Sequence, residues 1–219
     1  MRARWGTIGV AVAVAALCAV LPADAELTSG TACERLAGKD LAPAGDVKLV
    51  SRANADGGRD LRGCVLPDGK VRAVASGIES DTTVDRWALG EVRHAIVLVR
   101  YSASSQYGGG RSTFVYDLRS GRSYYLAQTC YTNVGSGCRP GAHDTRAASA
   151  HVNSAGQAAA AIVVAGTGTI RIVGVASTGR RTRFDSGPKD AIPPRSLRLH
   201  GHTVSWTHSG EPRTAELSG

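Results

Sequence analysis

The sequence predicts an all-β protein built from antiparallel hairpins, and three observations support this prediction. Apolar and polar residues alternate over short segments after Gly45, as in residues 47–50 and 71–75. Turns of the form x-x-Gly-Lys/Arg recur, with glycines at positions 69, 121 and 179. The fullest apolar run after the N-terminus, residues 158–165, has the length of a strand. We expect a partial β-propeller-like or sandwich domain, preceded by one short N-terminal helix.

The N-terminus has the three parts of a secretory signal peptide. Arg2 and Arg4 form a positive region, residues 8–21 are apolar, and Pro22 precedes a small-x-small site that ends at Ala25. A membrane-spanning helix needs roughly 20 apolar residues, so an uncleaved anchor is the weaker alternative. We expect cleavage after residue 25, secretion to the extracytoplasmic side, and no transmembrane span in the mature chain.

The mature chain would be basic and large enough for one domain. Removal of residues 1–25 leaves 194 residues with 24 basic and 17 acidic side chains, a net charge of +7. Arginine carries this charge, since the whole chain has 22 arginines and 4 lysines. A cationic surface suits anionic envelope polymers or phospholipid headgroups. The arginines are dispersed and Phe and Trp are rare, so we expect no nucleic-acid partner.

The cysteine count indicates disulfide bonds. Four cysteines remain after signal removal, and an even number in an exported chain is typical of disulfides. Four cysteines allow three pairings, of which we favour Cys33–Cys64 and Cys130–Cys138, because the second closes a short glycine-containing loop. Zinc is disfavoured because no C-x-x-C spacing is present.

The elements follow in order along the chain. Residues 26–44 form an N-terminal segment with a short helix near 31–41, where Thr31 and Glu34 have the spacing of a capping box. Residues 45–219 form the all-β repeat domain. Its expected strands are 47–50, 61–66, 71–75, 95–99, 112–118, 123–127, 159–164, 169–175, 181–184, 196–200 and 203–206.

These strands define a weak repeat of buried strand, loop, strand, turn and strand. Residues 114–122 (FVYDLRSGR) resemble the outer hairpin of a blade in TolB-like and quinoprotein-like bacterial β-propellers, and similar hairpins occur in secreted actinobacterial repeat proteins. The resemblance covers about residues 45–215, implies architecture only, and carries over no functional residues. Three and a half units are fewer than the roughly 4 to 8 blades of a closed propeller. Open sheet edges would favour self-association.

No cofactor motif is present, and the catalytic candidates are weak. His143, Asp144 and His151 could form a hydrolytic site, although the G-x-S-x-G motif is absent. His200, His202 and His208 could in principle share a metal ion, but Gly201 predicts a tight turn that would direct the first two rings into solvent. We therefore predict no metal site.

Tyrosines cluster between positions 101 and 131, and tyrosines on an exposed face can bind glycans or peptides. Tyr124 and Tyr125 should point to opposite faces of their strand. The predicted binding surface joins this region to neighbouring arginines, among them Arg100 and Arg119, and its core members are Tyr107, Tyr125, Tyr131, Arg111 and Arg122. The sequence thus favours an exported non-catalytic module that binds an extracytoplasmic protein or glycan. A cell-envelope hydrolase and a self-associating structural protein are the alternatives.

Overall fold

The computed structural model describes residues 32–33, 35–66, 69–80, 83–105, 108–130 and 145–218, and it confirms the all-β class. The predicted signal peptide lies outside these residues. Ala32 and Cys33 are helical, but strand β1 already begins at Lys39, so the helix expected near residues 31–41 is shorter than predicted. Gly38, the residue before β1, has a φ of 151°, a backbone conformation that other residues rarely adopt. No helix of the described residues is long and apolar enough to cross a membrane.

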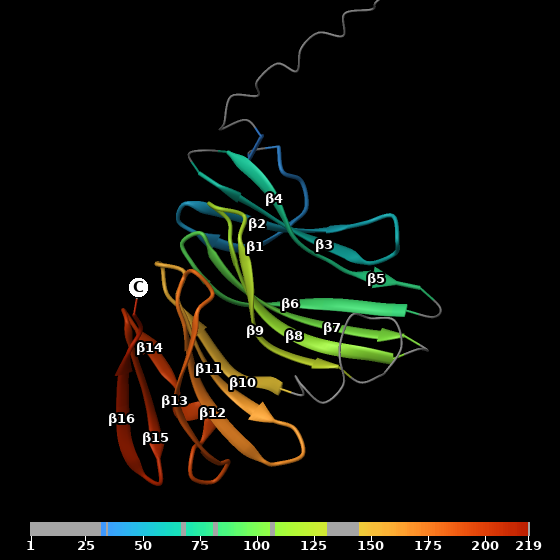
Figure 1. Cartoon of the computed structure of the whole chain (residues 1–219). Helices are drawn as coiled ribbons and strands as arrows, with labels where there is room; N and C mark the ends of the chain where they lie inside the picture. The colour runs from blue at the N-terminus through green and yellow to red at the C-terminus, as the bar shows by residue number, and fades with distance from the viewer. Residues whose placement is uncertain are drawn as a thin grey trace, which may run out of the picture.

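The strands form four antiparallel sheets, which follow one another in chain order (Figure 1). Sheet I contains β1 (Lys39–Ala44), β2 (Val47–Ala53), β3 (Arg59–Val65) and β4 (Lys70–Ser76). Sheet II contains β5 (Ile78–Glu79), β6 (Thr83–Arg93), β7 (Ile96–Ser105), β8 (Gly108–Asp117) and β9 (Ser123–Cys130). Sheet III contains β10 (Thr145–Val152), β11 (Ala158–Val164), β12 (Thr169–Val175) and β13 (Arg181–Pro188). Sheet IV contains β14 (Arg198–His200), β15 (Thr203–His208) and β16 (Glu211–Glu216), after a short 3-10 helix, η1 (Pro194–Ser196).

Each unit of the repeat seen in the sequence lies within one sheet, but the expected strands lacked β1, β5, β6, β10 and β16, so the sheets are larger than predicted. Each sheet is a meander in which consecutive strands are neighbours. The turn between its last two strands contains Gly69, Gly121, Gly179 or Gly210, and all four glycines have positive φ angles of 61°, 74°, 88° and 83°. Glycine adopts this conformation without the steric penalty of a Cβ atom, which explains why it recurs at this place.

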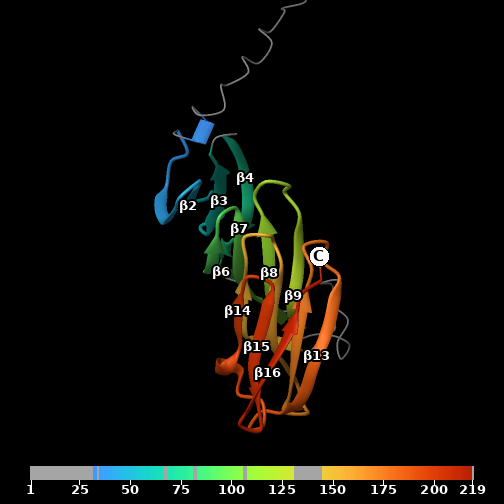
Figure 2. The same ribbon diagram turned by 90° about the vertical axis from the view of Figure 1, so that its left-hand side faces the viewer.

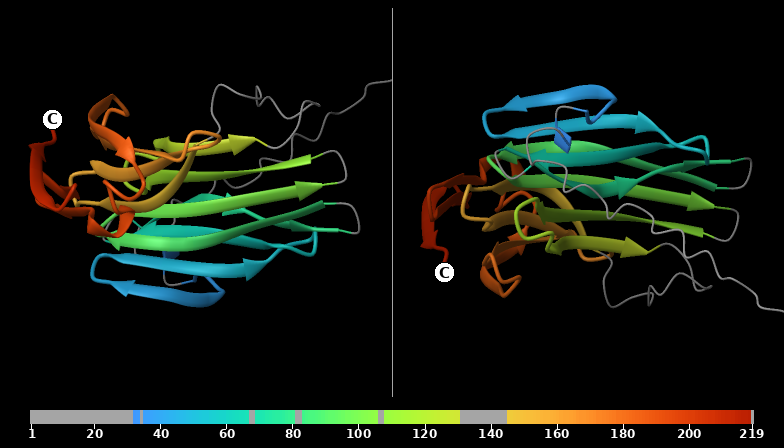
Figure 3. Two further views of the ribbon diagram at one scale, coloured as in Figure 1. Left: turned by 90° about the horizontal axis from the view of Figure 1, so that it is seen from below. Right: turned by 90° about the horizontal axis from the view of Figure 1, so that it is seen from above.

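Three hydrophobic cores hold the stack together, one between each pair of consecutive sheets. Sheets II and III each contribute alternate side chains to the cores on their two faces. Leu49 and Leu61 of sheet I meet Val97 and Val99 of sheet II. The core between sheets II and III includes Leu98, Val115, Leu126, Ala160 and Ile162. The core between sheets III and IV includes Ile170, Ile172, Leu197, Val204 and Trp206. The views from below and above show sheets I and II running alongside each other (Figure 3).

Sheets I and IV form the two ends of the stack, and each has one face that packs against no other sheet of the described residues. On the outer face of sheet I, the predicted disulfide Cys33–Cys64 is confirmed and fastens the N-terminal segment to β3. The Cys130–Cys138 pairing stays a prediction, because Cys130 ends β9 but Cys138 lies outside the described residues. Sheet IV covers the other end (Figure 2), and because Val204 and Trp206 face the core, Thr203, Ser205 and Thr207 face outward. Polar outer faces of this kind terminate stacked repeats. Self-association through strand edges stays a prediction.

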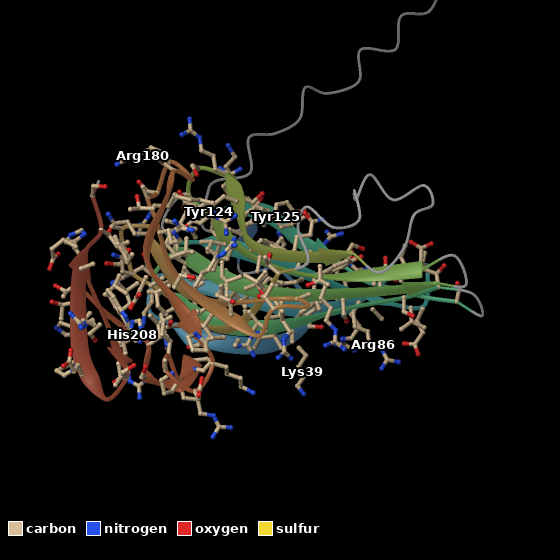
Figure 4. The ribbon with its side chains drawn as sticks, turned by 60° about the horizontal axis from the view of Figure 1, so that its bottom comes forward. Lys39, Arg86, Tyr124, Tyr125, Arg180 and His208 are labelled. Atoms are coloured by element: carbon tan, nitrogen blue, oxygen red, sulfur yellow. A yellow bond between two sulfur atoms is a disulfide. The ribbon has the colours of Figure 1, made fainter. Side chains whose placement is uncertain are left out.

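Polar side chains reinforce the interfaces between sheets. The Tyr124 hydroxyl donates to the carbonyl oxygen of Gly156, 2.6 Å away, and burial raises the pKa of Tyr124. Arg181 of β13 donates to the carbonyl of Leu126, the extra residue of a β-bulge in β9. Tyr124 therefore points toward sheet III, whereas Tyr125 is 56% exposed on the other face, as the alternation predicted (Figure 4).

Candidate functional site

The predicted binding residues fall into separate regions. Tyr107 and Tyr131 lie outside the described residues. Tyr125 is exposed on the face of β9 that is turned toward sheet I, and Arg122 follows the β8–β9 turn. Arg111 lies on the opposite face of sheet II, because it shares the alternation of Val115 in the core with sheet III. The structure therefore does not join Tyr125, Arg111 and Arg122 into one patch.

Arg111 instead lines a cleft between sheets II and III. The cleft has a volume of about 600 Å³. Four of its lining residues are arginines: Arg86 on β6, Arg100 on β7, Arg111 on β8 and Arg146 on β10. All four arginines are exposed. We call this site the arginine cleft.

The strand sequences explain why a cleft opens here. On the face of β7 turned toward sheet III, the apolar Ile96 and Leu98 are followed by Arg100 and Ser102. On β8 the same face changes from Val115 to polar residues. Apolar side chains hold the two sheets in contact along one half of these strands. Charged side chains prefer water along the other half of β6, β7 and β8, and the cleft opens there. Strand β9 stays attached to sheet III, because the Thr129 hydroxyl donates to the carbonyl oxygen of Thr145 at 2.8 Å.

The register of sheet II places three arginines close together. Ser102 of β7 pairs with Arg86 on one side and with Arg111 on the other. Arg100, two residues before Ser102 on the same face, pairs with Ala88 and Thr113. Each arginine is therefore surrounded by small side chains, and Arg100 is a diagonal neighbour of both others, at about 7–8 Å between Cα atoms. Long guanidinium groups converge easily over such a distance.

Few acidic groups compensate this charge. The side chains of Arg100, Arg111 and Arg146 have no hydrogen-bond or ion-pair partner among the described residues. Arg86 has one, Glu79 at 3.4 Å, and this pair is exposed. Two unit charges about 8 Å apart repel by about 0.5 kcal/mol in water and about 2 kcal/mol near a protein surface. Mutual repulsion between these like charges would favour a bound anion.

A second pocket lies on the other side of strand β6, between sheets I and II. Its volume is about 420 Å³, and it shares Arg86 and Trp87 with the arginine cleft. Lys39, Glu79 and Asp85 also line it. Its charges are mixed, unlike those of the arginine cleft. Figure 4 shows Lys39 and Arg86 on the same side of the stack.

Hydrogen bonds fix the side chains of the second pocket. The indole Nε1 of Trp87 donates to the carbonyl oxygen of Arg59 at 2.6 Å, and Arg59 Nε donates to Ser51 Oγ at 2.6 Å. The Tyr101 hydroxyl donates to Asp85 Oδ2 at 2.6 Å. Burial and this carboxylate raise the pKa of Tyr101, so the hydroxyl keeps its proton. The Trp87 ring and the Asp85 carboxylate are therefore preorganised.

Of the predicted catalytic residues, His143 and Asp144 lie outside the described residues, and His151 lies on β10. Its Nε2 is 3.3 Å from Ser149 Oγ, and its Nδ1 is 3.4 Å from Glu91 Oε2. Glu91 also accepts from the backbone N–H of Val152 and pairs with Arg93 at 2.6 Å. Hydroxyl, imidazole and carboxylate thus stand in the order of a nucleophile, a base and its orienting group.

The remaining histidines serve other roles. His200 and His202 are exposed on either side of Gly201, whose φ of 56° confirms the tight turn. The Nδ1 atom of His202 is 2.6 Å from Gln157 Oε1, and that of His208 is 2.8 Å from Asp185 Oδ2. Within the described ranges, no three His, Cys, Asp or Glu side chains are grouped so that they could hold a metal ion.

No family model matches the chain, and no curated protein matches it. Sequence reasoning included Arg100 and Arg111 in the candidate surface but missed Arg86, Trp87 and Arg146. Arg86 and Trp87 could have been found from the strand alternation around them. Arg146 could not, because its place in the cleft depends on how sheets II and III stack.

Proposed function

We propose that this chain is an exported, non-catalytic binding module whose ligand is anionic and enters the arginine cleft. One observation carries the proposal: four exposed arginines line one cleft, and three of them have no acidic partner among the described residues. The cleft volume of about 600 Å³ lies in the usual range for ligand sites, which is about 300–1,000 Å³. The N-terminal segment and the Cys33–Cys64 disulfide support the extracytoplasmic location.

The chemistry of arginine narrows the ligand class. A guanidinium group binds carboxylate or phosphate through two parallel hydrogen bonds. Three such groups on one sheet face would hold a ligand with more than one anionic oxygen. Anionic envelope polymers with carboxylate or phosphate groups fit this description, and so does an acidic peptide.

The test is a calorimetric titration of the purified chain with hyaluronan, a poly(glycerol phosphate) and poly-glutamate. Arg111→Gln removes one charge-assisted contact, worth about 1.5–3 kcal/mol, so we expect affinity for the bound polymer to fall about 10- to 100-fold. Arg122→Gln is the matched control, because it removes an exposed arginine of the same sheet away from the cleft. The affinity of Arg122→Gln for the polymer should stay within about twofold of the wild-type affinity.

Two results would overturn the proposal. One is the absence of binding to all three polymers at about 0.15 M salt, where surface charges are screened beyond about 8 Å. The other is an equal loss of affinity in Arg111→Gln and Arg122→Gln, which would indicate binding by net charge.

A second candidate, a cell-envelope hydrolase, is favoured by the Ser149, His151 and Glu91 arrangement. In an ester hydrolysis, Ser149 Oγ would attack the carbonyl carbon while its proton passes to His151 Nε2 and then to the leaving alcohol. Water would hydrolyse the resulting acyl group and restore the hydroxyl. The order of contacts supports this candidate.

Chromogenic carboxylic esters test this second candidate. Hydrolysis that is lost in both Ser149→Ala and His151→Ala, and kept in His200→Ala, would establish it. Hydrolysis that is unchanged in His151→Ala would exclude the site. The exposed His200 serves as control because it lies at the β14–β15 turn.

A further inference from the structure

We infer that the anionic ligand is a glycan chain that crosses strand β6 at Trp87 and continues from the arginine cleft into the second pocket. This inference rests on the proposed function and names the ligand class. It follows from the position, the chemistry and the fixed aromatic ring of the second pocket.

The two pockets share two lining residues. Arg86 and Trp87 line both of them, one pocket on each side of β6. Strand β6 pairs with β5 only at Val84 and Asp85, so the edge of β6 carries no paired strand at the point where the pockets meet. A ligand that fills the arginine cleft and extends past Arg86 therefore enters the second pocket.

The second pocket offers hydrogen-bond acceptors where the first offers cations. Asp85 Oδ2 is held by the Tyr101 hydroxyl, and Asp85 Oδ1 has no hydrogen-bond partner among the described residues. The Glu79 carboxylate lies at the boundary with Arg86. Carboxylates accept hydrogen bonds from hydroxyl groups, which sugars carry in number. Lys39 adds a donor for ring or carbonyl oxygens.

Trp87 supplies the third element of a sugar site. Its side chain is half-buried, and the bond from Nε1 to the carbonyl of Arg59 fixes the indole plane. An aromatic ring held in this way gives a large, rigid and amphipathic contact surface at small cost in conformational entropy. The apolar face of a pyranose ring could pack against it.

The contrast between the two pockets also predicts the charge pattern of the glycan ligand. A unit in the arginine cleft is expected to carry carboxylate or phosphate. A second acidic unit directly beside it would meet Glu79 and Asp85 together with Lys39 and Arg59, whose charges cancel, so it would lose its hydration without a net electrostatic gain. The preferred ligand therefore alternates acidic and uncharged sugar units.

The experiment compares four carbohydrates by calorimetry. Hyaluronan tetrasaccharide alternates acidic and neutral units, tetragalacturonate is acidic at every unit, chitotetraose is neutral, and glucuronic acid is a single acidic unit. We expect the hyaluronan tetrasaccharide to bind at least about tenfold more tightly than each of the others.

Variants locate the second contact. Trp87→Leu should weaken binding of the hyaluronan tetrasaccharide about tenfold and change glucuronic acid binding less than about twofold. Trp87→Phe keeps an aromatic ring and should retain most of the affinity. Asp85→Asn, which keeps the volume of the side chain, should also weaken binding of the tetrasaccharide. This variant tests the inference if Trp87→Leu does not fold.

The outcomes separate this inference from the proposed function. Equal affinity for hyaluronan and tetragalacturonate, with no effect of Trp87→Leu or Asp85→Asn, would overturn the inference and leave the arginine cleft in place. Tighter binding of poly-glutamate than of every glycan would also overturn it. If no anion binds the chain, the proposed function itself fails.

Discussion

Asp185→Asn is expected to loosen the interface between sheets III and IV. Two donors converge on one carboxylate oxygen of Asp185: the Trp206 Nε1–H at 2.7 Å and the His208 Nδ1 at 2.8 Å. Trp206 is only 6% exposed and stacks on Phe184, so its N–H is poorly placed to find a water molecule instead. Asparagine keeps the volume of the side chain and removes the charge.

The expected cost follows from these contacts. A hydrogen bond to a charged group contributes about 1.5–3 kcal/mol and a neutral one about 1 kcal/mol. Loss of the charge at two bonds, discounted because Asp185 is 18% exposed, gives about 2 kcal/mol. For a chain of this size, Tm should fall by about 4–8 °C.

The effect should depend on pH in a defined direction. Burial alone would raise the pKa of Asp185, but the hydrogen bonds from Trp206 and His208 outweigh it and lower this pKa. A lowered folded-state pKa means that the stabilisation is present above the ordinary Asp value, about 3.9. It is lost as pH falls through the folded-state value. The difference between wild type and Asp185→Asn should therefore shrink below about pH 4.

Urea unfolding, monitored by tryptophan fluorescence, tests this prediction by measuring the free energy of unfolding. In the expected mature chain the tryptophans are Trp87 and Trp206, so a Trp87→Phe background reports on Trp206 alone. Asp190→Asn is the control, because Asp190 is exposed and accepts only a local bond from the N–H of Ala191. A free energy of unfolding within about 0.5 kcal/mol of the parent would refute the reasoning.

Three further changes should affect stability. Gly174→Ala would place a Cβ atom 2.5 Å from Phe184, so we expect a loss of about 1–3 kcal/mol in urea unfolding, and wild-type stability would contradict the packing described. Cys33→Ser opens the disulfide to Cys64, whose sequence separation is 31, and should cost about 3–4 kcal/mol; an unchanged urea midpoint would show that the bond is not formed. Tyr124→Phe removes one bond between sheets II and III and should cost about 1 kcal/mol, with thermal unfolding as the measurement and no shift in Tm as the contrary result.

The architecture was largely predictable because its contacts are local. Every sheet is a meander of consecutive hairpins, and Gly121 and Gly179 mark turns that can be recognised within four residues. The N-terminal segment was less predictable. Its capping-box spacing indicated a helix through residue 41, whereas pairing with β2 draws Lys39 into a strand. Tertiary pairing here outweighs the local helical signal.

The candidate site was only partly predictable because it depends on long-range stacking. Arg100 and Arg111 are close in sequence and were grouped correctly, but Arg146 comes from another sheet. The grouping of Arg111 with Tyr125 failed for a different reason. A bulge between Thr113 and Phe114 in the β8–β9 register shifts the alternation of β9, and nothing in the sequence marks it.

The claim that anions bind in the arginine cleft can be tested directly by arginine modification. The chain is treated with phenylglyoxal, with and without saturating hyaluronan, and modified peptides are quantified by mass spectrometry. Bound ligand should protect the cleft arginines, represented by Arg100 and Arg111, and leave Arg122 and Arg180 as reactive as in the free chain, because all four are exposed without it. Equal protection at all four arginines, or protection at Arg180 alone, would contradict the assignment of the cleft.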